Sequence, residues 1–142
     1  NITIRDLRFS YGSREVLHGI NLEIRTGEMI GIVGPSGAGK TTLINLICRF
    51  FDPTHGSISV DGNDVRKYPV SEYRKNIGIV LQDPFLFFGS IADNIAYGKP
   101  GVTREEVIGA ARFAKAHPFI LNLSEAYDSL VGERGQSLSS GE

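Results

Sequence analysis

A glycine-rich stretch from Gly34 to Thr41 carries the clearest chemistry in this sequence. It reads GPSGAGKT and fits the pattern G-x-x-x-x-G-K-[ST] in full. Glycines let consecutive backbone N–H groups point inward, and the positive end of a following helix strengthens such a cradle for phosphate oxygens. We expect Lys40 to bridge the β- and γ-phosphates of a nucleotide and the Thr41 hydroxyl to ligate Mg²⁺.

This loop alone leaves the reaction open, because kinases, GTPases and motor ATPases share it. A phosphate loop usually works with an acidic residue at the end of a neighbouring apolar strand. Asp61 and Asp83 are the two candidates, but Asp61 lies in an Asp-Gly pair typical of a hairpin turn, and Asp83 is displaced from its apolar run. Neither is a convincing magnesium ligand.

The elements that must position the loop follow one another as strands, the glycine loop with a helix, more strands, and then helices. This order predicts an α/β fold. Alternation predicts a strand over residues 2–9, with one phase slip, and a half-buried strand over 20–24. Continuous apolar runs at 29–33 and 77–81 predict strands that are covered on both faces. The other predicted elements of this half are a helix over 41–51, a strand over 57–60 and a tight turn at Asp61-Gly62.

After Pro84 the sequence changes to helices. Ser90 with Asp93, and Thr103 with Glu106, have the spacing of helix-start capping boxes. Apolar residues at helical spacing predict one helical face over 104–116. The second half of the chain is therefore predicted to be helical.

Composition limits the class of protein. The chain has 142 residues, a formal net charge of −1 and 41% hydrophobic residues, as expected for one compact globular domain. The near-neutral charge argues against nucleic acid as a partner. The single cysteine, Cys48, excludes an internal disulfide and is interpreted as a small packed residue.

Several further motifs, in order along the chain, resemble the nucleotide-binding domain of ATP-binding cassette (ABC) transporters. Tyr11 resembles the aromatic residue that stacks on adenine, and residues 34–42 resemble the Walker A loop. Gln82 stands where the family has its Q-loop glutamine, near Mg²⁺ and the attacking water. The sequence LSSGE at 138–142 resembles the signature motif LSGGQ, with Ser140 in place of a glycine and Glu142 in place of the glutamine.

The resemblance implies a P-loop NTPase core with an antiparallel β portion over residues 1–84, and a helical subdomain over 85–142. It implies ATP and Mg²⁺ as cofactors, catalytic roles for Lys40 and Gln82, and Mg²⁺ ligation by Thr41 and Gln82. The residues implied to bind the nucleotide are Tyr11, Gly34, Ser36, Gly37, Ala38, Gly39, Lys40, Thr41, Thr42 and Gln82. The signature residues Ser139, Ser140, Gly141 and Glu142 would act on the ATP of an opposite subunit in a head-to-tail dimer.

Two stretches are similar to exporter-type members of the family. They are the segment after Gln82, which reads DPFLF, and residues 131–135, which are similar to the X-loop that touches the membrane domain. The resemblance therefore implies a transmembrane domain as partner, in the same chain or another, and a place on the cytoplasmic face of a membrane.

The sequence also looks unfinished. Residues 139–142 form a helix-start capping box with no helix after it. The family's Walker B aspartate, catalytic glutamate and switch histidine would lie beyond Glu142. We expect the 142 residues by themselves to bind nucleotide but not to hydrolyse it efficiently.

Three other functions stay open at this point. A soluble ABC ATPase acting on nucleic acid or ribosomes is disfavoured by the exporter-like stretches and the charge. A small-molecule kinase would need an arginine-rich lid, whereas Arg104, Arg112 and Arg134 are widely spaced. A non-catalytic nucleotide-binding module is compatible with the changes at Ser140 and Glu142.

Overall fold

The computed structural model describes residues 1–82 and 85–131, and these form two units that each have a core of their own. The first unit is Asn1–Ile77 and the second is Gly78–Glu142. Within the described residues, no helix has the length and apolar character to cross a bilayer.

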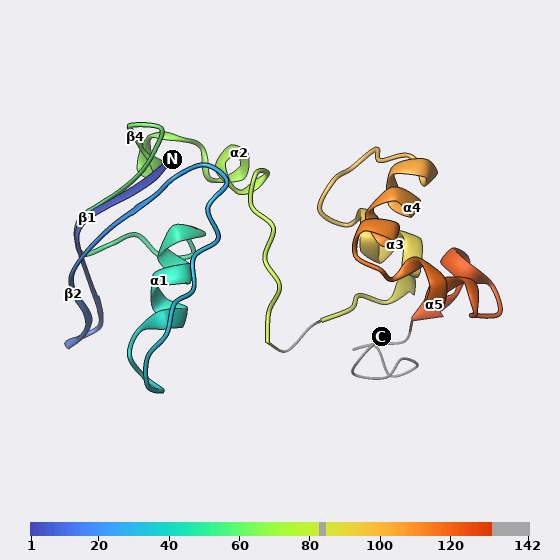
Figure 1. The fold of residues 1–142 in the computed structure, drawn as a ribbon, viewed down its shortest axis with the longest axis horizontal. Coiled ribbons are helices and arrows are strands. Elements are labelled where there is room, and N and C mark those ends of the chain that lie inside the picture. The colour runs from blue at the N-terminus through green and yellow to red at the C-terminus, as the bar shows by residue number, and fades with distance from the viewer. Residues whose placement is uncertain (83–84, 132–142) are drawn as a thin grey trace. The chain divides into compact units, whose positions relative to one another are not determined.

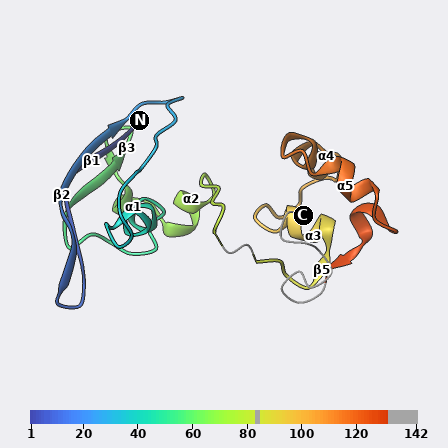
Figure 2. The same cartoon turned by 60° about the horizontal axis from the view of Figure 1, so that its bottom comes forward.

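The first unit is built on a four-stranded sheet with the order β2-β1-β3-β4 (Figures 1 and 2). Its strands are β1 (Ile2–Tyr11), β2 (Arg14–Ile24), β3 (His55–Val60) and β4 (Asn63–Asp64), and each neighbouring pair is antiparallel. The antiparallel β portion that the family resemblance implied is confirmed.

The phase slip predicted in the first strand is real. The pairing of β1 with β2 shifts register between Ile4 and Leu7, and Asp6 between them has a φ of 41°. The shift turns both Ile4 and Leu7 inward, where their exposed fractions are 1% and 0%. The bulge therefore keeps the apolar side chains of both strand halves on the core face.

Helix α1 (Lys40–Ile47) covers one face of this sheet, and its Leu43 and Leu46 belong to the same buried cluster as Ile4, Leu7 and Ile58. The unit is completed by a short 3₁₀ turn, η1 (Val65–Lys67), and by helix α2 (Val70–Arg74). The predicted turn at Asp61-Gly62 joins β3 to β4, with both φ values positive. Asp61 is thus a hairpin residue.

The second unit is mainly helical (Figure 1). It contains α3 (Ile91–Ala96), α4 (Arg104–Phe113), α5 (His117–Leu121) and the 3₁₀ turn η2 (Ala126–Asp128). Short strands β5 (Gly89–Ser90) and β6 (Leu130–Val131) pair antiparallel. Both predicted capping boxes are present, at the starts of α3 and α4.

Two expectations about strands and one about a helix are wrong for the described residues. Residues 29–33 and 77–81 are irregular, and Met29, Val33 and Val80 are more than 90% exposed. A strand needs hydrogen-bonded neighbours, and no described segment pairs with either run. The helix predicted over 41–51 ends at Ile47, because Arg49 takes a left-handed conformation.

Candidate functional site

The glycine-rich loop leads directly into α1, as the sequence pattern predicted. Gly37 and Gly39 have φ values of 79° and 87°, a region that L side chains rarely adopt. At Gly39 a Cβ atom would also lie 2.7 Å from the Leu17 side chain in β2. The loop can therefore pack this closely against the sheet only with glycine at position 39.

The Lys40 side chain folds back over the loop. Its ammonium nitrogen donates to the carbonyl oxygens of Gly34, at 2.8 Å, and Pro35, at 2.7 Å. These two carbonyls hold a positive charge at the mouth of the loop, next to the first backbone N–H groups of α1. An anion entering the loop would meet both the ammonium and the positive end of the helix.

The first turn of α1 is arranged to leave its N–H groups available. Gly39 caps the helix without a side-chain hydrogen bond, and the first turn contains no acidic residue. Thr41 is exposed in this turn, whereas Thr42 is buried, with 8% of its surface exposed. The Thr41 hydroxyl can therefore reach a ligand in the loop, and Thr42 packs towards the core.

Tyr11 ends β1 with 44% of its surface exposed. Its ring makes edge-on contacts with Phe9, at 4.8 Å between ring centroids, and with Phe51, at 5.6 Å. The aromatic cluster fixes the orientation of the tyrosine and leaves part of the ring free. Such a ring can stack on a planar base.

The other predicted site residues lie outside the first unit. Gln82 is exposed and belongs to the second unit. Asp83 and residues 132–142, which include Ser139, Ser140, Gly141, Glu142 and most of the X-loop-like stretch, lie outside the described residues. Their roles, and the domain boundary after residue 84, stay predictions.

Cys48 follows α1 and is buried, with 5% of its surface exposed. Burial raises the pKa of its thiol. The thiol therefore stays protonated at neutral pH, as expected for a packed residue at the C-terminal end of α1.

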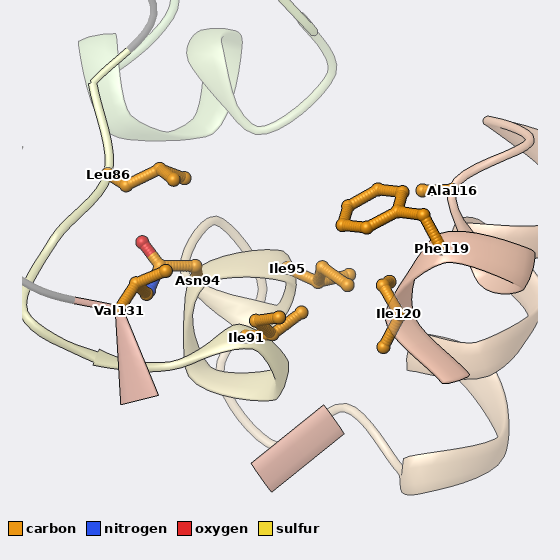
Figure 3. Close-up of a pocket in the computed structure, with 8 residues that line it drawn as sticks. All are labelled: Leu86, Ile91, Asn94, Ile95, Ala116, Phe119, Ile120 and Val131. Carbon is orange, nitrogen blue, oxygen red and sulfur yellow. The ribbon is translucent and has the colours of Figure 1, made fainter. Parts of the chain in front are cut away.

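The second unit contains an apolar pocket of about 190 Å³, shown in Figure 3. Its lining consists of Leu86, Ile91, Asn94, Ile95, Ala116, Phe119, Ile120 and Val131. The one polar member, Asn94, is occupied: its amide group donates to the carbonyls of Phe87 and Ser90 and accepts from the N–H of Phe87. The lining is therefore mostly apolar, which does not suit a phosphate group.

Sequence reasoning missed the residues that hold the far end of α1. Arg49, Tyr73 and Arg74 hydrogen-bond to backbone carbonyls around that end. Their side chains meet only through the tertiary fold, and no local pattern marks them.

Comparison with known proteins agrees with the phosphate-loop geometry. The sequence model of the family described as "ABC transporter" matches residues 17–142. The chain is 51% identical to the ATP-dependent lipid A-core flippase of Syntrophus aciditrophicus over 99% of its own length and 24% of the flippase. It is 48% identical to the multidrug resistance protein homolog 65 of Drosophila melanogaster, over 100% of the chain and 11% of that protein.

A solved structure gives the same result. A bacterial Atm1-family ABC exporter with ATP bound matches with a TM-score of 0.93 and 45% identity, over 99% of this chain and 25% of the exporter. The chain thus spans about a quarter or less of these relatives. The loop, the helix behind it and these similarities lead to one conclusion: the chain belongs to the ABC transporter family.

Proposed function

We propose that this chain is the ATP-binding part of the nucleotide-binding domain of an ABC exporter. The observation that carries the proposal is the Lys40 ammonium held over a glycine loop at the start of α1. The family membership and the exporters among the relatives support it. The intact protein would bind and hydrolyse ATP to move a substrate across a membrane.

Within this proposal the loop from Gly34 to Gly39 surrounds the phosphates with backbone N–H groups, and Lys40 neutralises the β- and γ-phosphates. Tyr11 stacks on adenine. The exposed hydroxyl of Thr41 and the amide oxygen of Gln82 are hard oxygen donors, which suit Mg²⁺. Within the described parts of the chain, no three His, Cys, Asp or Glu side chains gather as a metal site.

Bound Mg²⁺ would neutralise charge that develops on the phosphates. The chain's own contribution is to hold the γ-phosphate in place through Lys40 and to orient the attacking water through Gln82. The residues for full hydrolysis, the Walker B aspartate, the catalytic glutamate and the switch histidine, would come from sequence after Glu142. The 142 residues alone would bind ATP without efficient turnover.

The proposed partners follow from the same assignment. A transmembrane domain would contact the exporter-like stretches after Gln82 and at 131–135. A second nucleotide-binding domain would pack head to tail, so that Ser139, Ser140, Gly141 and Glu142 face the ATP of the opposite subunit. The chain would then lie at the cytoplasmic face of the membrane.

Lys40→Ala in the full-length protein tests the proposal. Losing this charge-assisted contact should weaken Mg-ATP binding by about 1.5–3 kcal/mol and remove ATP turnover. Calorimetry and phosphate release are the measurements, with Lys67→Ala, an exposed lysine of the same unit, as the control. Unchanged affinity and turnover in Lys40→Ala would refute the assignment of the loop.

A further inference from the structure

The end of α1 remote from the phosphate loop has an unusual backbone. Arg49, just beyond the helix, has a φ of 57°, a conformation that glycine usually takes at this position. The backbone closes in a Schellman pattern, in which Phe50 donates to the carbonyl of Asn45 and Arg49 donates to that of Leu46. A residue other than glycine in this conformation costs free energy, which the surrounding contacts must offset. The contacts of the Arg49 side chain are therefore of interest.

The Arg49 side chain is nearly buried, with 12% exposed, and its guanidinium reaches the loop before α2. One nitrogen, Nη1, donates to the carbonyls of Val65, at 2.9 Å, and Tyr68, at 2.6 Å. Arg49 therefore fastens the end of α1 to the segment that leads into α2.

Helix α2 makes the reciprocal contact. Arg74 donates through Nε to the carbonyl of Cys48, at 3.2 Å, and through Nη2 to the carbonyl of Arg49. The Tyr73 hydroxyl donates to the carbonyl of Ile47 at 2.7 Å. Three carbonyls at the end of α1, which the helix itself cannot satisfy, thus each receive a side-chain donor from α2.

We propose that Arg49, Tyr73 and Arg74, here called the arginine clasp, are positioning residues for nucleotide binding. Helix α1 has eight residues, about 12 Å, so a shift at its clasped end is carried to Lys40 at the other end. The clasp fixes α1 against α2 and thereby holds the Lys40 ammonium and the first N–H groups of α1 in register with the phosphates. The inference rests on the proposed function of the loop.

The test uses the full-length protein with Arg74→Gln, and with Arg49→Gly, which favours the left-handed backbone and removes the whole arginine side chain with its hydrogen bonds. We expect the Kd for Mg-ATP, measured by calorimetry per folded molecule, to rise about 3- to 10-fold in each variant. We expect kcat at saturating ATP to stay within about two-fold, because the clasp touches no reacting group. Arg5→Gln is the matched control, since Arg5 is an exposed arginine of the same unit and is not part of the clasp.

Two further variants keep the inference falsifiable if a glutamine or glycine variant fails to fold. Tyr73→Phe removes only the hydroxyl that reaches Ile47, and Arg74→Lys keeps the charge with fewer donors; both should raise the Kd, by less than Arg74→Gln does. In the double variant Arg49→Gly/Arg74→Gln, the fold-rise in Kd should be smaller than the product of the fold-rises in the two single variants, because both residues belong to one clasp.

The outcomes separate the two proposals. If the wild-type protein does not bind Mg-ATP, the proposed function itself fails. If the wild type binds but the clasp variants melt at lower temperature with an unchanged Kd, the residues are merely structural and the inference is overturned. A fall in kcat with an unchanged Kd would overturn it as well.

Discussion

Tyr11 lies at the end of β1, partly packed against other aromatic rings and partly exposed. Its ring contacts Phe9 and Phe51 through edges, which buries part of the ring and fixes its tilt. The remaining 44% exposure leaves an aromatic surface for a ligand. Substitution of this single residue can test whether the exposed part of the ring contributes to ATP binding.

We expect Tyr11→Phe to bind ATP nearly as well as the wild type, because stacking needs the ring and not the hydroxyl. Tyr11→Ala should weaken binding by about 1–3 kcal/mol, the range found for base stacking on aromatic side chains. Calorimetry on the full-length protein checks both variants. Equal affinity in Tyr11→Ala would assign the ring to core packing alone.

At the scale of the element, α4 depends on electrostatics at its first turn. Thr103 and Glu106 form a reciprocal capping box, and Lys99 donates to the Glu106 carboxylate at 2.8 Å. The bond from Lys99 and then those from Thr103 lower the pKa of Glu106 from its usual 4.5 to about 2. The carboxylate therefore stays ionised in the folded protein well below the pH at which it would protonate in an unfolded chain.

The sign of the pH dependence follows from this lowered pKa. The stabilisation from ionised Glu106 is fully present above about pH 4.5 and is lost as the pH falls towards 2. We expect Glu106→Gln to lower the melting temperature at pH 7 and to differ less from the wild type as the pH decreases. Thermal unfolding of the full-length protein between pH 7 and pH 3 measures this.

Lys99→Met is the companion variant, because it removes the largest cause of the shift. Its loss of stability on acidification should be smaller than that of the wild type and should be complete at a higher pH, because the folded-state pKa of Glu106 lies closer to its value in the unfolded chain. A constant difference between Glu106→Gln and the wild type across the whole range would contradict the proposed ionisation.

At the scale of the whole molecule, two apolar runs have no partner within the described residues. Met29 and Val33 in one, and Val80 in the other, are almost fully exposed. Their continuous apolar sequence is typical of strands inside a parallel sheet, which only neighbouring strands can complete. The chain covers about a quarter of the lipid A-core flippase and of the solved exporter, and we expect such neighbours to lie in sequence outside these 142 residues.

We expect the amides of residues 29–33 in the full-length protein to exchange hydrogen about 100-fold or more slowly than unpaired backbone, which corresponds to about 2.7 kcal/mol. Their protection should approach that of the core strand β1 in the same molecule. Hydrogen exchange with mass spectrometry measures both segments together. Exchange as fast as in an open loop would show that the segment stays irregular in the intact protein.

Features that depend on neighbours a few positions away could be predicted from the amino-acid sequence. The glycine loop before α1, the slip in β1 and the two capping boxes were all predictable, because each arises from φ preference, alternation or an N-cap three residues from its partner. The family resemblance, drawn from motif order along the chain, is confirmed by the matches to ABC transporters.

Long-range contacts set where α1 ends and what holds that end. The apolar spacing continues to Phe51, yet the helix stops at Ile47, because Arg49 turns left-handed and reaches carbonyls of the loop before α2. Likewise, the run at 29–33 has the apolar character of a strand but becomes one only beside a partner. Contacts between residues distant in sequence, such as that of Arg74 with the end of α1, leave no periodic signal, so no local pattern predicts them.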